Sequence, residues 1–184
     1  MSEQKKSLIL IIGMPGSGKS TAARAAAKLG FRVFSFGDIV RDEVRRRGLA
    51  QNEANVEKIA NWFHAGREYM LAHRLEKKLR KIRTQKPFYV VEGARSPRQL
   101  SELKRHFDAK ILAVTLPARI RWRRQLARGR ADIRTPADAK ERDARELHYG
   151  IGKMMRRATW RISSDCTEKV FRARCARFFA SLLK

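Results

Sequence analysis

Glycines, a lysine and hydroxyl side chains follow one another closely near the start of the chain, in an arrangement that suits phosphate binding. The stretch matches G-x-x-x-x-G-K-[ST] at every fixed position. Glycines at these spacings let backbone N–H groups turn inward around phosphate oxygens, and a helix beginning there adds partial positive charge. The lysine reaches the β- and γ-phosphates of a nucleoside triphosphate, and the hydroxyl coordinates Mg²⁺. We therefore expect ATP and Mg²⁺ to be bound by Gly13, Met14, Pro15, Gly16, Ser17, Gly18, Lys19, Ser20 and Thr21.

The segments around this loop support the interpretation and narrow it. Residues 8–12, within a predicted strand over 7–12, are apolar at successive positions, as interior parallel strands are, and residues 20–29 form an alanine-rich helix. The sequence lacks the guanine-reading N-K-x-D pattern of G proteins, and 184 residues leave no room for a helicase core. A small kinase is the leading interpretation.

Two further segments each place an arginine just after a predicted strand. The carboxyl ends of parallel strands meet at one edge of a sheet, where ligands bind. An acceptor phosphate is an anion that must approach ATP, so arginines at that edge are the expected binding groups. Either arginine could instead be one more solvated side chain among the 28 of this chain. The segments are Gly37-Asp38-Ile39-Val40-Arg41 and Glu92-Gly93-Ala94-Arg95.

The two carboxylates in these segments have more than one interpretation. Glu92 ends a buried strand, where an unpaired carboxylate is costly, so we expect it to hold Mg²⁺-bound water; a structural ion pair is the alternative. Asp38 would order Mg²⁺-bound water or Arg41 in an enzyme with a phosphate acceptor. In an enzyme that phosphorylates a hydroxyl group, Asp38 would be the general base.

These segments resemble those of the adenylate kinase group of nucleoside monophosphate kinases. In that group, G-D-x-x-R and D-G-x-x-R segments each give an arginine to the acceptor phosphate. Arg41 matches the first, whereas Arg95 follows its glycine with one residue fewer between them, and Glu92 replaces the aspartate. Gln99 stands where the family has a glutamine that reads adenine. The resemblance therefore implies AMP as the acceptor, bound by Gly37, Asp38, Arg41, Gly93, Arg95 and Gln99.

A still closer resemblance, over almost the whole chain, is to archaeal proteins described as adenylate-kinase-related. It runs through G-M-P-G-S-G-K-S-T, G-D-x-V-R, G-x-R-S and R-D-x-R-E-L-x-x-G-I-G. This resemblance implies a fold and a substrate class, without a particular acceptor.

An arginine-rich region follows between residues 119 and 145. In the adenylate kinase group an R-x-x-x-R pair opens a lid, and further arginines close it over the phosphates of ATP. Arg124 and Arg128 match the pair, and we expect Arg128 and Arg142 to act in catalysis with Lys19 and Arg95. Arg145 is a further candidate, and Asp143 is placed to orient one of these arginines. The lid would cover about 130–141 and holds no cysteine, which excludes the zinc-binding form.

Strands alternating with helices predict the fold class. We expect strands over 7–12, 31–36, 87–91, 110–116 and 159–163, and such alternation implies mostly parallel pairing. The predicted fold is an α/β P-loop three-layer sandwich of about five strands in a single domain, 1–184. Residues 37–86 would be a helical acceptor-binding segment, with one broken or two linked helices over 52–83.

The net charge of +25 exceeds what a nucleotide pocket requires. A surface of this kind attracts polyanions by counterion release, which makes contact with RNA or the ribosome one interpretation. The alternative is a proteome rich in arginine or a hot habitat, although thermophile networks pair acidic with basic residues and acidic residues are scarce here. The first apolar run has five residues, far short of a membrane span, and two cysteines indicate a reducing compartment. We expect a cytoplasmic protein without a membrane contact.

Three functions remain open at this point. The first is an ATP-dependent nucleoside monophosphate kinase acting on AMP. The second is a hydroxyl kinase similar to dephospho-coenzyme A kinases, which share the phosphate loop and a short lid. The third is an ATPase switch that works on RNA or in ribosome assembly.

Overall fold

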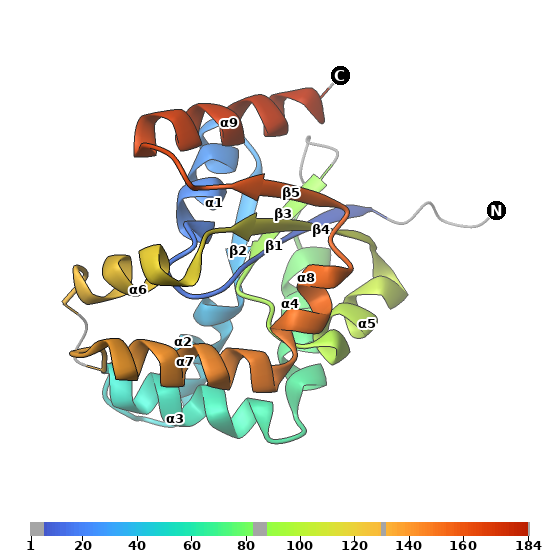
Figure 1. The fold of residues 1–184 in the computed structure, drawn as a ribbon. Coiled ribbons are helices and arrows are strands. Elements are labelled where there is room, and N and C mark those ends of the chain that lie inside the picture. Colours follow the sequence, from blue (N-terminus) through green and yellow to red (C-terminus); the bar gives the residue numbers. More distant parts are fainter. Residues whose placement is uncertain (1–5, 83–87, 130–131, 184) are drawn as a thin grey trace.

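The computed structural model describes residues 6–82, 88–129 and 132–183 (Figure 1). Their centre is a parallel sheet of five strands in the order β2-β3-β1-β4-β5. β1 lies between β3 and β4, and a strand covered on both faces must be apolar at successive positions. The predicted α/β class is confirmed. The strands are β1 (Ser7–Ile12), β2 (Arg32–Ser35), β3 (Phe88–Glu92), β4 (Asp108–Thr115) and β5 (Trp160–Ser163).

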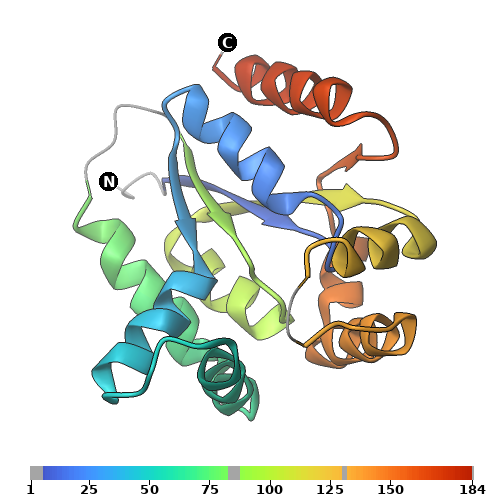
Figure 2. The same cartoon turned by 90° about the vertical axis from the view of Figure 1, so that its left-hand side faces the viewer.

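Helices cover both faces of the sheet, because each crossover between parallel strands returns over one face. On one face, α1 (Lys19–Lys28) and α9 (Glu168–Ser181) pack on Ile9 and Ile11 of β1. On the opposite face, the core that contains the intervening residues of β1 includes side chains of the two helices that follow β2 and of three other helices. Figure 2 shows the resulting three layers. Those three other helices are α4 (Glu68–Arg80), α5 (Pro97–His106) and α8 (Ile151–Arg156).

The segment between β2 and β3 is helical, as predicted for the acceptor side. It contains α2 (Phe36–Arg46) and α3 (Glu53–His64) before α4. The region predicted as one broken or two linked helices is two helices, separated by a turn at Gly66 with φ of +83°. Residues 83–86 of the predicted segment lie outside the described residues.

A buried carboxylate joins two helices of this segment. Glu43 on α2 is fully buried, and its oxygens accept hydrogen bonds from three arginines. Arg46 and Arg47 are its neighbours on α2, and Arg74 reaches it from α4 at 2.7 Å. These hydrogen bonds hold the pKa of the Glu43 carboxyl far below its usual range, so it stays ionised.

The region predicted to form a lid lies between α6 (Ala118–Leu126) and α7 (Pro136–Tyr149). α7 begins with a capping box formed by Thr135 and Asp138, so the second half of the predicted lid is helical. Residues 130 and 131 lie outside the described residues. Closure of this region over a ligand stays a prediction.

None of the helices within the described ranges is both long and apolar enough to span a bilayer.

Candidate active site

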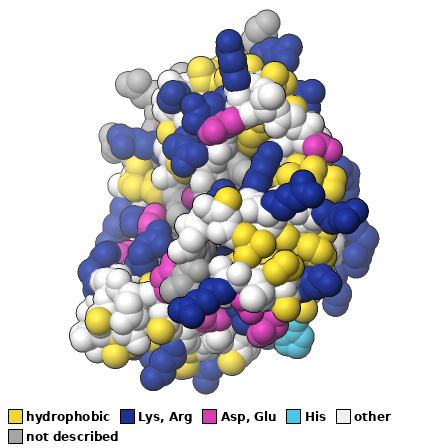
Figure 3. Space-filling model, turned by 60° about the vertical axis from the view of Figure 1, so that its left-hand side comes forward, with side chains coloured by type: hydrophobic (Ala, Val, Ile, Leu, Met, Phe, Trp, Pro, Cys, Tyr) yellow, Lys and Arg dark blue, Asp and Glu magenta, His cyan; other side chains and the backbone are white. Residues whose placement is uncertain are grey.

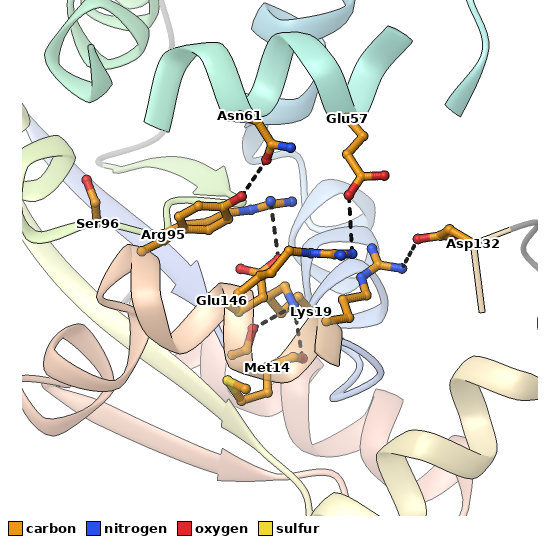
Figure 4. Close-up of polar contacts among 12 residues, drawn as sticks. Met14, Lys19, Glu57, Asn61, Arg95, Ser96, Asp132 and Glu146 are labelled. Atoms are coloured by element: carbon orange, nitrogen blue, oxygen red, sulfur yellow. Dashed lines mark hydrogen bonds and ion pairs between the residues drawn. The ribbon is translucent and has the colours of Figure 1, made fainter. Parts of the chain in front are cut away.

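The phosphate loop connects the end of β1 to the start of α1, as its sequence context predicts. Two of its glycines are required by the backbone: Gly18 has φ of +99°, and a Cβ on Gly16 would lie 2.6 Å from the Arg121 carbonyl oxygen. The Lys19 ammonium donates to the carbonyl oxygens of Gly13 at 2.7 Å and Met14 at 3.1 Å (Figure 4). The lysine therefore lies across the loop that it is expected to complete around a phosphate.

The charge of Lys19 is destabilised where it lies. Burial lowers the pKa of the ammonium to about 8, and the nearby carboxylate of Glu146 partly opposes this effect. The positive charge of Arg95 lowers the pKa further. An anion bound beside Lys19 would stabilise its protonated form.

Arg121 of α6 contacts the phosphate loop through its side chain. Its buried guanidinium donates to the carbonyl oxygens of Leu116 and Pro15 and forms a 2.8 Å ion pair with Asp143. Trp122 also donates to Asp143, at 2.9 Å. The expectation that Asp143 orients one of the lid arginines is wrong, because its carboxylate is occupied by residues of α6 that lie beneath the loop.

Arg124 reaches the loop indirectly. Its guanidinium donates to the Ser164 carbonyl oxygen at 3.2 Å, and the Ser164 hydroxyl donates to the Ser17 carbonyl oxygen at 2.7 Å. Arg124 thus joins α6 to the segment after β5 and to the loop. Its contact with ATP stays a prediction.

A cavity of about 160 Å³ opens directly at the loop. It brings together all four residues that the sequence predicts to be catalytic, although they come from α1, the end of β3 and the two sides of the lid region. Glu146 of α7 lines the same cavity and was not singled out in the sequence. The four predicted residues are Lys19, Arg95, Arg128 and Arg142.

A larger cavity of about 390 Å³ lies beside the first, between the phosphate loop and the acceptor-side helices. Its apolar wall includes Phe36, Val56 and Leu71, and its polar residues include Arg41 and Gln99. The cavity is therefore suited to a ligand with an apolar part and an anionic part. Further predicted residues that line it are Lys19, Ser20, Gly37, Glu92, Gly93, Arg95 and Arg142.

Asp38 forms an ion pair with Arg41 beside this cavity. Its carboxylate accepts from Arg41 at 2.6 Å, and both side chains are about half exposed. Arg41, in the second turn of α2, is therefore held by a residue of the first turn. This contact fits the interpretation in which Asp38 orders Arg41.

Gln99 occupies the start of α5 in a way that restricts its chemistry. Its side-chain oxygen accepts from the backbone N–H groups of Arg95 at 2.7 Å and Ser96 at 3.1 Å. Both partners are donors, which fixes the orientation of the amide and leaves its nitrogen facing away. That nitrogen is buried and has no hydrogen-bond partner among the described residues. The adenine-reading role stays a prediction, with only the amide nitrogen available for it.

His64 also lines the larger cavity, which its sequence pattern did not indicate. Its ring stacks on Tyr149 of α7, with ring centres 4.0 Å apart. Burial, and after it the charge of Arg95, lowers the pKa of His64 to about 3, so the imidazole is neutral. The Tyr149 hydroxyl donates to Asn61, so α3 and α7 meet above the site (Figure 4).

A phosphate loop after the central strand of a parallel sheet, with a second cavity lined by arginines beside it, is the arrangement of a P-loop kinase-like protein. The chain belongs to the family described as AAA domain, whose model matches residues 12–140, and to the UPF0200 proteins of archaea. The UPF0200 protein of Pyrococcus horikoshii is 33% identical, with 96% of this chain and 97% of the relative covered. That of Methanothrix thermoacetophila is 38% identical, with 91% and 93% covered.

Solved structures share the fold. The TT1252 protein of Thermus thermophilus superposes with a TM-score of 0.68 at 19% identity, over 98% of this chain and 100% of its own. A shikimate kinase from Acinetobacter baumannii, solved with shikimate, gives a TM-score of 0.59 at 15% identity, over 97% and 96% of the two chains. The predicted P-loop kinase-like fold is confirmed.

Proposed function

We propose that the protein transfers the γ-phosphate of ATP to a nucleoside monophosphate, with AMP as the acceptor. One observation carries this proposal: Lys19, Arg95 and Arg142 line both the cavity at the phosphate loop and the larger cavity beside it. Three cations at the junction of two cavities suit two phosphates that must meet there despite their like charge.

In this scheme the chain acts by positioning and by balancing charge. Lys19 and the loop N–H groups bind the β- and γ-phosphates, while Arg128 and Arg142 offset the charge on the group in transfer. Arg41 and Arg95 hold the acceptor phosphate so that one of its oxygens faces the γ-phosphate in line. The acceptor needs no general base, because its attacking oxygen is already an anion.

The oxygen donors present fit Mg²⁺. The Ser20 hydroxyl and the Glu92 carboxylate line the same cavity as Lys19, and oxygen atoms are the ligands that Mg²⁺ prefers. Ser20 would hold the ion directly and Glu92 would hold it through water. When bound, the ion supplies positive charge to the β- and γ-phosphate oxygens.

A hydroxyl kinase is the second candidate, because Asp38 lies in the first turn of α2 next to Gly37 of the larger cavity. Asp38 would then be the general base. Its ion pair with Arg41 favours the first candidate, because the carboxylate is then engaged with an arginine that would bind the acceptor phosphate.

The experiment is a coupled measurement of ATP consumption with nucleoside monophosphates, dephospho-coenzyme A and RNA offered separately. We expect turnover with AMP, and loss of turnover in a folded Lys19→Ala variant. Turnover with dephospho-coenzyme A and none with any monophosphate would replace the proposal by the hydroxyl kinase. Consumption stimulated by RNA alone would replace it by the ATPase switch.

We also propose that the basic surface contacts RNA or the ribosome. Lys and Arg side chains cover much of the face shown in Figure 3, with fewer Asp and Glu among them. Part of this charge is used within the fold: Arg46 and Arg47 bind Glu43, and Arg172 binds Glu168. The excess of 43 basic over 18 acidic residues is too large for such pairs to cancel.

A further inference from the structure

Glu146 is an acidic residue placed among the cations of the proposed site. Its side chain is 8% exposed, and its carboxylate forms a 3.2 Å ion pair with the guanidinium of Arg95 (Figure 4). It lines the cavity at the phosphate loop together with Lys19 and Arg142. Of the charged groups that act on Lys19, it affects the pKa of that lysine most, in the direction that favours the charged form.

A carboxylate in this position opposes the function of the cavity. A buried carboxylate is costly unless cations compensate it, and the cations that compensate Glu146 are those that a phosphate needs. If Arg95 paired with the Glu146 carboxylate and with a bound phosphate at the same time, these two anions would lie close together. Neither the transfer step nor the proposed Mg²⁺ site uses Glu146.

The cations also explain why an internal anion is useful. Without one, Lys19, Arg95, Arg128 and Arg142 would line a cavity of about 160 Å³ with no carboxylate among the groups that line it. Asp132 pairs with Arg142 at 3.4 Å but does not line this cavity. Without a carboxylate in the cavity, the like charges would separate the side chains or remove a proton from Lys19, whose pKa is already lowered to about 8. An anion supplied by α7 keeps the cations together between turnovers.

We propose that Glu146 is an internal substitute for a substrate phosphate. It pairs with Arg95 in the empty site, competes with the incoming phosphate, and thereby limits how tightly phosphates and products are held. This proposal rests on the phosphate-binding part of the proposed function and does not depend on which acceptor is used. Glu146 is thus a positioning residue for Arg95 and Lys19.

The proposal predicts a gain of affinity when the charge is removed. Glu146→Gln should bind inorganic pyrophosphate about 3- to 30-fold more tightly than the unmodified protein, the size expected for one unit charge nearby in a partly solvated site. Calorimetry at pH 6 is suitable, because Lys19 with its pKa of about 8 is then protonated in the unmodified protein. In turnover assays the same variant should show a lower KM for its phosphate substrates and a lower kcat, because products leave more slowly.

Glu57→Gln is a matched control. Glu57 also forms a 3.2 Å ion pair with an arginine, Arg145, but it comes from α3 and is 42% exposed. It lines a small neighbouring cavity that Arg95, Arg142 and Glu146 also line and that contains no residue of the phosphate loop. Its substitution should leave pyrophosphate binding within about twofold of the unmodified value, because solvent screens the charge that it removes.

The sign of the effect separates this role from a structural one. If Glu146 only stabilises the fold, Glu146→Gln should bind pyrophosphate equally or more weakly, and that result would overturn the proposal. Should that variant fail to fold, Glu146→Asp tests the same idea by withdrawing the charge from Arg95 by one methylene group, and a smaller gain of affinity is expected. An unchanged or reduced affinity in a folded Glu146→Asp would also count against it. Pyrophosphate needs no acceptor, so a negative result with AMP in the turnover assay leaves this test intact.

Discussion

The guanidinium of Arg121 and the carboxylate of Asp143 form a buried ion pair at 2.8 Å that joins α6 to α7 beneath the phosphate loop. The same guanidinium donates to the carbonyl oxygen of Pro15 within the loop. The position of α7, which carries Arg142 and Glu146, is therefore linked through two side chains to the shape of the loop.

Breaking this pair should destabilise both the fold and the loop. Asp143→Asn leaves the buried charge of Arg121 without its partner, and we expect the free energy of unfolding to fall by about 3 kcal/mol. Urea denaturation measures this change, and the affinity for ATP should fall with it. Glu57→Gln, which removes a half-exposed pair, should cost less than about 1 kcal/mol. Equal small effects in the two variants would contradict the structural role of Arg121.

Lys19 should give the protein two opposite responses to pH. Its folded pKa of about 8 lies below the value of 10.5 for the free side chain, so the unfolded chain binds more protons between these values. Its contribution to stability therefore rises with pH over that range. ATP binding should weaken above about pH 8, because the phosphates need the protonated lysine. Titration calorimetry with ATP across this pH range measures the effect, with Lys19→Met as the control. ATP affinity should fall above about pH 8 in the unmodified protein and not in the variant. The same pH dependence of affinity in both proteins would refute the prediction.

Arg41 should affect acceptor binding far more than ATP binding. Arg41→Ala should weaken AMP binding by about 1.5–3 kcal/mol, the range for hydrogen bonds to charged groups. Arg45→Ala is the matched control, because Arg45 lies one turn further along α2 and pairs with Asp42. Arg95→Ala should weaken AMP binding by a similar amount. Two results together would show that the acceptor is not a monophosphate. They are normal AMP binding in Arg41→Ala and in Arg95→Ala, and loss of phosphorylation of a hydroxyl substrate in Asp38→Asn.

Gln99 should donate a hydrogen bond to an acceptor atom of the base and should accept none from it. Its oxygen is occupied by two backbone N–H groups, so only its amide nitrogen can contact adenine. The AMP analogue that lacks ring nitrogen N1 should therefore bind more weakly by about 1 kcal/mol. The analogue that lacks the 6-amino group should bind as AMP does. The reverse order of affinities would mean that the capping box opens when the ligand binds.

Binding of RNA should depend steeply on salt and should not depend on the nucleotide site. Contacts between basic side chains and phosphates release counterions, so affinity should fall by about 10³ or more between 50 and 200 mM salt if six or more phosphates are contacted. Lys19→Ala should bind RNA as the unmodified protein does. Undetectable binding at about 50 mM salt would leave the charge as a property of composition.

The sequence alone determined the nucleotide loop and the alternation of strands and helices along the chain. The spacing of Gly13, Gly18 and Lys19 is a local signal, since the backbone conformation it requires lies within a few residues. Arg41 and Arg95 could also be placed near one another, because each follows a parallel strand and those strands end at the same edge. α8 was missed, since its six residues are too few to show a helical period.

Only the tertiary structure decided which charged residues face the site. α6 and α7 carry so many arginines and acids that neither period nor composition distinguishes Arg121, Asp143 and Glu146 from their neighbours. Their partners lie far away in the sequence: Pro15 for Arg121, and Arg95 for Glu146. The packing of α7 against the phosphate loop brings these groups together, and contacts of that range depend on how the helices dock rather than on any local pattern.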